Sequence, residues 1–83
     1  MEKYFLFALL VKPGKEIETI YEKSLSSVNA SLRLYSNLVD SYRSASSNPK
    51  VVRYFLDDNS IWIKKTSVSF GDSVIYVYLQ NLS

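Results

Sequence analysis

Apolar residues between positions 15 and 48 recur at alternating steps of four and three, and this stretch contains neither proline nor glycine. Such spacing is typical of an amphipathic α-helix, so the pattern predicts one long helix over residues 15–48. The predicted apolar stripe consists of Tyr21, Leu25, Val28, Leu32, Tyr35, Val39 and Tyr42, with Ile17 and Leu38 at its edge. The weak point is residues 26–31, whose serines and asparagine lower helix propensity and could cap a second helix. We favour a continuous helix, because the stripe keeps its phase through this segment.

The length of this helix predicts self-association. A helix of about 32 residues would run about 48 Å, whereas a strand of about ten residues covers only about 33 Å. The helix would therefore overhang its own sheet, and the simplest partner for the overhang is a second copy of the chain. The contact residues that we expect are Tyr21, Leu32, Tyr35, Val39 and Tyr42. A break within residues 26–31 would instead fold the helix back onto its own sheet.

The remaining apolar segments predict short strands. Residues 3–11 are apolar at both parities, which is typical of a strand covered on both faces, at the centre of a sheet or at a subunit contact. Residues 51–56, 61–70 and 73–80 carry the β-branched and aromatic side chains that strands favour. Turn residues separate them at positions 57–60 and at Gly71 and Asp72. The predicted fold is therefore α+β, in the order β-α-β-β-β, with an antiparallel sheet, the helix on one face, and a single domain over residues 1–83.

The Gly71–Asp72 loop also predicts a register for the last two strands. If the loop has two residues, Val68 faces Ile75 and Lys65 faces Tyr78, and side chains alternate between the two faces. The helix side then carries Val68, Phe70, Ile75, Val77 and Leu79, and the other side carries Lys65, Ser67, Val74, Tyr76 and Tyr78. Ile61 and Ile63 have the wrong parity for the helix side. Either a bulge near Lys64 and Lys65 corrects it, or these isoleucines pack in a subunit contact.

Composition narrows the ways in which so small a domain can be stabilised. The chain has 83 residues and neither cysteine nor histidine, so disulfides and the commonest metal ligands are excluded. Oligomerisation remains as the usual means of stabilising a small fold. The apolar run at positions 4–11 is far shorter than the roughly 20 residues of a membrane-spanning helix. We expect a soluble, cytoplasmic protein with no membrane partner and no cofactor.

Candidate catalytic chemistry is sparse. There is no Gly-x-Ser-x-Gly motif and, with two glycines far apart, no phosphate-binding loop. Asp57, Asp58 and Asn59 could hold a hard cation such as Mg²⁺, but Asp and Asn are equally the residues of a polar turn, which is the interpretation we favour. We therefore predict no catalytic residues, no metal site and no enzymatic activity.

Tyrosines and cations on one sheet face give a second hypothesis. Such a face can stack bases and contact phosphates, as sheet-based single-strand binders do. The candidate nucleic-acid-binding residues are Arg53, Lys64, Lys65, Tyr76 and Tyr78. Two other interpretations are cross-strand Tyr–Lys pairs that stabilise the sheet, or tyrosines in an oligomer contact. The net charge of +2 is too small to decide between them.

The segment from Val11 to Glu16, placed between a strand and the predicted helix, resembles the corresponding segment of the dimeric α/β-barrel family related to antibiotic-biosynthesis monooxygenases. The resemblance covers only the first strand and the start of the helix. That family is ferredoxin-like and has a second helix before its last strand, which this chain lacks. The resemblance therefore implies no active-site residue here, only that such a unit can dimerise through its sheet.

Three functions follow, in order of preference. The first is a non-enzymatic interaction or regulatory protein that acts through oligomeric surfaces, as a homodimer or higher homo-oligomer. The second is a nucleic-acid-binding protein that uses the tyrosine and lysine face. The third is a small-ligand or cofactor-free enzyme site in a cleft between subunits.

Overall fold

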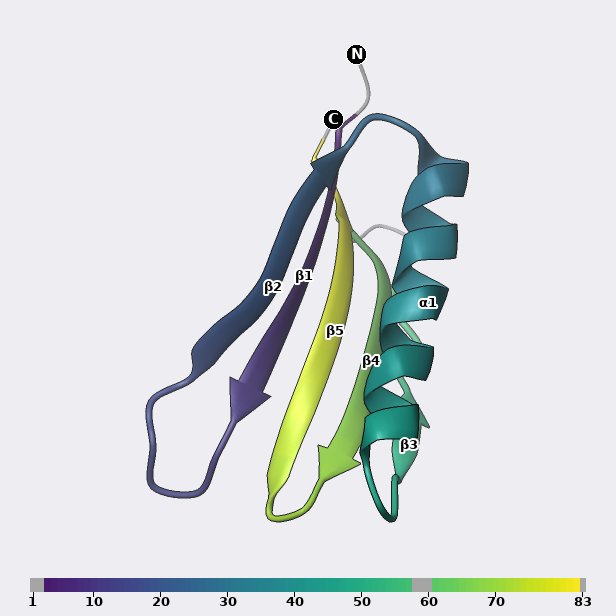
Figure 1. Ribbon diagram of the computed structural model, residues 1–83. Helices are drawn as coiled ribbons and strands as arrows, with labels where there is room; N and C mark the ends of the chain where they lie inside the picture. The colour runs from purple at the N-terminus through teal and green to yellow at the C-terminus, as the bar shows by residue number, and fades with distance from the viewer. Residues whose placement is uncertain (1–2, 58–60, 83) are drawn as a thin grey trace.

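The computed structural model describes residues 3–57 and 61–82, which form a five-stranded antiparallel sheet with an α-helix on one face (Figure 1). The elements are β1 (Tyr4–Val11), β2 (Glu18–Leu25), α1 (Val28–Ala45), β3 (Val51–Arg53), β4 (Trp62–Phe70) and β5 (Ser73–Asn81). The strands lie in the order β2-β1-β5-β4-β3. The predicted α+β class, with an antiparallel sheet and a helix on one of its faces, is confirmed.

The predicted helix over residues 15–48 is wrong in its first third, where the chain forms the edge strand β2 instead. A turn before this strand reverses the chain: the Lys15 N–H donates to the Lys12 carbonyl, with Pro13 and Gly14 between them. Gly14 has φ 68°, as the third residue of a type II turn requires. The strand was misread because Tyr21 and Leu25 are four residues apart, a spacing that puts two side chains on one side of a helix or of a strand.

The same turn corrects the family resemblance. The segment from Val11 to Glu16 closes a hairpin between β1 and β2 and does not lead into a helix. The order of elements is therefore β-β-α-β-β-β, with one strand more than the sequence predicts.

The helix begins at the weak point of the predicted stripe. Ser27 is its N-cap: the side-chain oxygen accepts from the Ala30 N–H, and the carbonyl accepts from the Ser31 N–H and Oγ. At the other end, the Ser46 Oγ donates to the Ser69 carbonyl, which ties the helix end to β4. With 18 residues, α1 is about 27 Å long, which the strands of the sheet can cover. The overhang that motivated a partner for the helix therefore does not exist.

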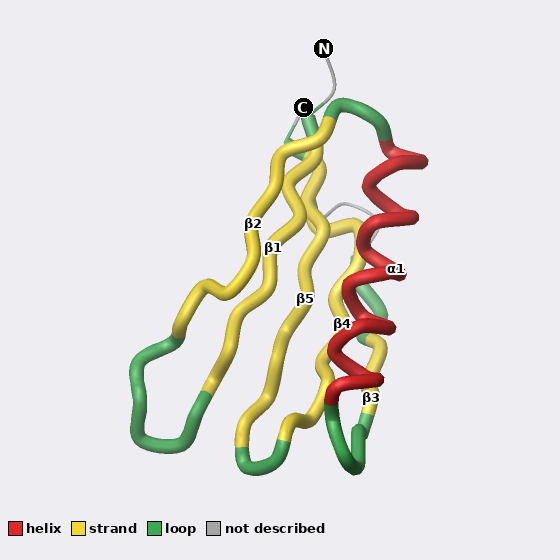
Figure 2. Tube along the Cα trace, viewed as in Figure 1, coloured by secondary structure: helices red, strands yellow, loops and turns green. Residues whose placement is uncertain are grey.

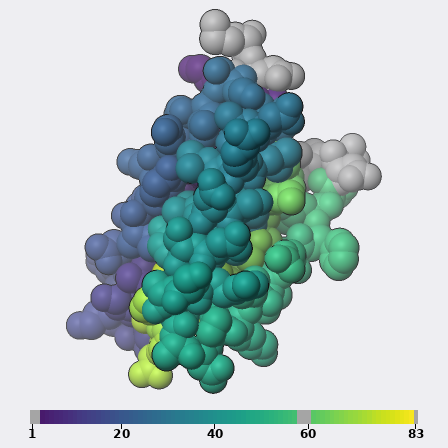
Figure 3. Space-filling view, turned by 45° about the vertical axis from the view of Figure 1, so that its right-hand side comes forward, coloured from purple at the N-terminus to yellow at the C-terminus, as the bar shows by residue number. Residues whose placement is uncertain are grey.

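The core lies between α1 and the sheet, and Figure 3 shows the helix running along this side of the molecule. Its buried apolar residues are Tyr4, Leu6, Ala8, Tyr35, Val39, Val68, Ile75, Val77 and Leu79. Tyr35 and Val39, predicted as oligomer contacts, are only 5% and 6% exposed. They are therefore not available to a second copy. The other three predicted contacts, Tyr21, Leu32 and Tyr42, pack against the same core and are half-buried.

The hairpin of β4 and β5 follows the predicted register. Gly71 and Asp72 form the loop, Val68 pairs with Ile75, and Lys65 pairs with Tyr78. The register shifts between Trp62 and Lys64, close to the predicted bulge. This shift turns Ile63 towards the core, where it packs against the buried cluster.

Three connections lie at one end of the molecule, and the start of β1 and the end of β5 lie near the other (Figure 2). The three are the β1–β2 loop, the β4–β5 loop and the segment from α1 to β3. β3 has three residues, because residues 54–57 leave the strand conformation that the sequence predicts for 51–56. The predicted turn and possible cation site at Asp57, Asp58 and Asn59 falls largely on residues 58–60, which lie outside the described residues.

Candidate functional site

The sheet face opposite α1, here called the outer face, is covered by no element of the described chain (Figure 1). Side chains alternate along each strand, so β1 sends Tyr4, Leu6 and Ala8 to the core and its other residues to the outer face. The outer positions of the three middle strands are Phe5, Phe7, Leu9 and Val11 in β1, Val74, Tyr76, Tyr78 and Gln80 in β5, and Trp62, Lys65, Ser67 and Ser69 in β4. The strand β1 is therefore apolar on both faces, but only its helix side is covered by another element of the described chain.

Aromatic rings on the outer face form one connected cluster centred on Tyr78. Its ring lies 5.0 Å from Phe7 and almost parallel to it, at an angle of 11°. The ring centres of Trp62 and Tyr76 lie 5.1 and 6.4 Å from that of Tyr78. Phe5 stacks on Phe7 at 5.3 Å. All five side chains are half-buried, because each covers part of its neighbour. We call these five residues the aromatic cluster.

Lys65 lies at one side of this cluster. Its Nζ is 5.3 Å from the ring centre of Tyr78, 5.4 Å from that of Tyr76 and 4.6 Å from that of Tyr54. Distances within about 6 Å are typical of cation–π contacts. Tyr54 is held over β4, since its N–H donates to the Lys65 carbonyl and its hydroxyl donates to the Ser67 Oγ. The cation is therefore surrounded by three rings on the open side of the sheet.

The outer face carries little charge. Among the strand positions that the register places on it, only Lys65 in β4 and Glu22 in β2 are charged. A groove or face that follows a nucleic-acid backbone normally presents several cations. The surface is therefore mainly aromatic and aliphatic.

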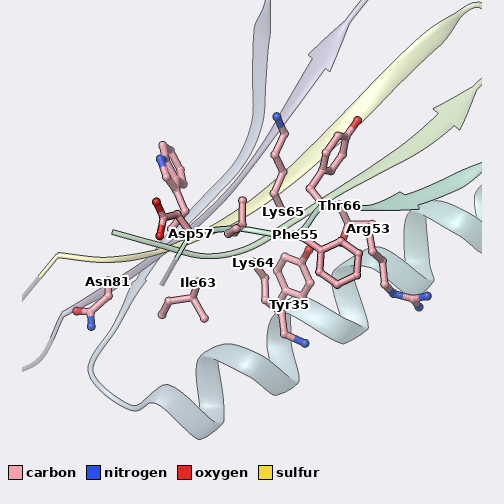
Figure 4. A pocket seen from close by; sticks show the side chains of 12 residues that line it. Tyr35, Arg53, Phe55, Asp57, Ile63, Lys64, Lys65, Thr66 and Asn81 are labelled. Atoms are coloured by element: carbon pink, nitrogen blue, oxygen red, sulfur yellow. The ribbon is translucent and has the colours of Figure 1, made fainter. Parts of the chain in front are cut away.

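The predicted nucleic-acid-binding residues are divided between the two sides of the sheet. Lys65, Tyr76 and Tyr78 share the outer face, as the sequence predicts. Lys64 and Arg53 are opposite Leu79 and Thr66, whose side chains are buried on the helix side. Figure 4 shows Lys64 reaching towards the helix and Lys65 reaching away from it. Consecutive strand residues point to opposite faces, so Lys64 and Lys65 cannot serve one surface.

Sequence reasoning missed most of the aromatic cluster. Phe5 and Phe7 were hidden because β1 is apolar at both parities, so neither set marks itself as exposed. Trp62 joins the cluster only because the bulge changes its parity relative to Lys64. Phe5 and Phe7 could have been found by extending the predicted register of the last two strands to β1 as the next strand of the sheet.

A groove of about 540 Å³ lies at the edge of the sheet where β3 ends, and we call it the edge groove (Figure 4). Its lining includes Arg53, Lys64, Phe55 and the paired hydroxyl groups of Tyr35 and Thr66. Burial raises the pKa of the Tyr35 hydroxyl, against smaller lowering effects of the Thr66 hydrogen bond and the Arg53 charge. Tyr35 therefore stays neutral and anchors α1 to β4.

Residues 3–57 and 61–82 contain no group of three acidic side chains that could hold a metal ion. The cation of Lys64 lies 5.9 Å from the centre of the Tyr35 ring, on the helix side of the sheet.

Among the helices of the described chain, none is long and apolar enough to cross a membrane.

No protein-family model matches this chain, and no curated protein or solved structure is significantly similar to it. The function is therefore inferred from the geometry of the outer face and of the edge groove.

Proposed function

We propose that this protein is a non-enzymatic interaction protein that works as a homo-oligomer, with the outer face as the surface that joins two copies. The observation that supports this proposal is the aromatic cluster, five rings linked by ring contacts on a face that no helix or strand of the described chain covers. Continuous apolar patches of this kind mark interaction sites. The cores of interfaces are enriched in aromatic residues and depleted of charge, as this face is.

The size of the outer face also suits a dimer. Four of the strands have eight or nine residues and are at least about 27 Å long, and four strands side by side are about 19 Å wide. Two such faces together present about 1,000 Å², the area at which a specific interface becomes plausible. Two sheets that pack face to face, about 10 Å apart, form an ordinary β-sandwich.

The proposal replaces the helix with the sheet as the site of self-association. A domain of 83 residues without cysteine has few ways to add to its core, and oligomerisation is a common one. Covering the outer face would give β1 apolar neighbours on both sides, which is what its sequence predicts for it.

The test is the oligomeric state of two matched variants. Leu9→Asp places a charge in the middle of the outer face, opposite Tyr76 on β5. Ile17→Asp makes the same change at a residue that is 63% exposed outside the strands. Sedimentation velocity at micromolar concentration should give a dimer for the native chain and for Ile17→Asp, and a monomer for Leu9→Asp. A monomeric native chain would contradict the proposal.

Single-stranded nucleic acid is a second candidate, and the cation of Lys65 among three tyrosine rings favours it. Bases stack on exposed aromatic rings, and each such contact is worth about 1–3 kcal/mol. The weak point is charge, because the outer strand positions include one cation and one anion. The measurement is the fluorescence anisotropy of a labelled oligonucleotide. Binding that weakens steeply between about 50 and about 200 mM salt, and that Lys65→Gln reduces, would support this candidate over the dimer.

A further inference from the structure

Four outer-face residues form one row across the sheet, with opposite charges at its two ends. Glu22 of β2 pairs with Phe7 of β1, Phe7 pairs with Tyr78 of β5, and Tyr78 pairs with Lys65 of β4. In antiparallel sheets directly paired residues point to the same face. The row therefore reads carboxylate, ring, ring, ammonium.

We propose that two copies pack outer face to outer face about a two-fold axis that runs parallel to the strands, between β1 and β5. In this arrangement Glu22 of each copy faces Lys65 of the other, and Phe7 of each copy faces Tyr78 of the other. The inference rests on the proposed function, to which it adds the orientation of the partner and the residues that select it.

The position of the axis follows from the strand order. The row occupies β2, β1, β5 and β4, which are neighbours in that order. Its midpoint therefore lies between β1 and β5. A rotation of half a turn about a line along the strands at this midpoint places the row of the second copy opposite the first row, in reverse order. Glu22 and Lys65 then lie on either side of the axis, each about one and a half strand spacings, or about 7 Å, away from it.

The neighbouring rows also suit this axis. One row is Ser24, Phe5, Gln80 and Trp62, and the next is Thr19, Leu9, Tyr76 and Ser67. The axis places Phe5 opposite Gln80 and Leu9 opposite Tyr76. No two like charges meet, and the apolar side chains of β1 lie against β5 of the other copy. The surface is thus self-complementary, as a two-fold interface requires.

The other in-plane axis fits worse. A two-fold axis perpendicular to the strands and centred on the same row would leave each strand above its own counterpart. Glu22 would then face Glu22, and Lys65 would face Lys65. Like charges in direct opposition are strongly unfavourable at an interface, so the charge pattern selects the axis parallel to the strands.

Pairing with Glu22 also solves a problem for Lys65. This side chain is half-buried among three rings, and a dimer would remove it further from water. A cation that is buried without a counter-charge is costly, whereas one with a well-placed carboxylate is not. Two sheets about 10 Å apart are close enough for a lysine and a glutamate to meet between them.

The experiment begins with charge reversals, each with a control in the same strand. Glu22→Lys and Lys65→Glu each place like charges opposite one another, twice in every dimer. Glu18→Lys and Lys64→Glu make the same changes at exposed residues that the register places on the helix side. We expect each of the first two to weaken dimerisation by about a hundredfold or more, and each control by less than about threefold. Sedimentation equilibrium gives the dissociation constants.

Mixing the two dimer-weakening variants then tests the pairing itself. In a mixed dimer of Glu22→Lys with Lys65→Glu, the introduced lysine faces the introduced glutamate, and the other pair is the native Glu22 and Lys65. The mixture should therefore form heterodimers with close to native affinity, although each variant alone is a monomer. Native-like circular dichroism of each variant, and the recovery on mixing, show that the loss is not a failure to fold.

The outcomes separate this inference from the proposed function. A native chain that is monomeric at all concentrations overturns both, and salt-sensitive binding of an oligonucleotide by that monomer would assign the outer face to nucleic acid. A native dimer that Leu9→Asp dissociates, but that Glu22→Lys and Lys65→Glu leave intact, overturns only the proposed axis. Monomeric single variants that fail to associate when mixed also overturn it, because the axis requires their charges to match.

Discussion

The two faces of this sheet are built from the same strands but differ in how far their side chains are buried. On the helix side, Leu6, Val77 and Leu79 are fully buried under α1. On the outer face, Phe7 and Tyr78 occupy the adjacent positions and are only partly covered by one another. The comparison shows that the apolar content of β1 and β5 exceeds what one helix can cover. The first face forms the core of the fold, and the second is the surface that we propose joins two copies.

The largest expected effect comes from truncating one leucine on each face of β1. Leu6→Ala should lower the free energy of unfolding by about 2–5 kcal/mol, because it leaves a cavity in the core. Leu9→Ala should lower it by about 1 kcal/mol or less in the monomer, since Leu9 is half-buried on the outer face. Urea unfolding at low protein concentration measures both values. Equal losses would remove the distinction between the two faces.

A smaller effect is expected at the polar contact that joins α1 to β4. The hydroxyl groups of Tyr35 and Thr66 are hydrogen-bonded in a buried position, and Thr66→Val leaves the tyrosine hydroxyl without that partner, at a cost of about 1–3 kcal/mol. On the outer face, Tyr54→Phe removes the longer hydrogen bond to Ser67 from a residue that is 39% exposed, so we expect a loss below about 0.5 kcal/mol. Thermal unfolding of both variants checks the difference, which a larger loss in Tyr54→Phe would contradict.

The cation on the outer face should contribute modestly to the stability of the monomer. Lys65→Gln removes its contacts with three partly exposed tyrosine rings and should cost about 0.5–1 kcal/mol. Lys64→Gln, on the helix side with a single ring at 5.9 Å, should cost less. Urea unfolding of the two neighbours in parallel gives the comparison. A larger loss for Lys64→Gln would show that the rings on the outer face do not hold Lys65.

The smallest effect is a pH dependence confined to the helix side. Burial raises the pKa of the Tyr35 hydroxyl above its ordinary value of 10.0. The unfolded chain therefore loses this proton first as the pH rises, so stability is unaffected below about pH 10 and falls above it. Tyr35→Phe should lose less stability than the native chain between about pH 9 and about pH 11. The measurement is chemical denaturation of both proteins at the two pH values. Equal losses of unfolding free energy in the native chain and in Tyr35→Phe would contradict the assignment.

Much of the C-terminal half follows from the sequence. Gly71 and Asp72 allow one tight loop, and this loop fixes the face of every residue in β4 and β5 up to the bulge. The division of Lys64 and Lys65 follows from the same alternation. The sequence could also place the start of α1, because the serines that weaken the helix pattern include its N-cap, Ser27.

The N-terminal half could not be predicted in the same way. Tyr21 and Leu25 satisfy a helix and a strand equally, and only the hydrogen-bonded pairing with β1 decides between them. The outer face depends on this choice. If residues 15–27 formed a helix, Glu22 would not belong to the sheet. In the edge strand β2 it lies on the outer face, at the opposite end of a row from Lys65. Local pattern gives no information about such rows, which consist of residues from four separate strands.

The most direct test of the outer face as the contact between copies uses the emission of Trp62, the single tryptophan of the chain, which lies in the aromatic cluster. The measurement is the emission maximum of the native protein over a dilution series, with the mass followed by light scattering. If two copies meet at the outer face, the maximum shifts to longer wavelength over the same concentrations at which the dimer dissociates. A dimer that dissociates with no change in the emission of Trp62 would place the contact elsewhere, and a monomer throughout the series would contradict self-association itself.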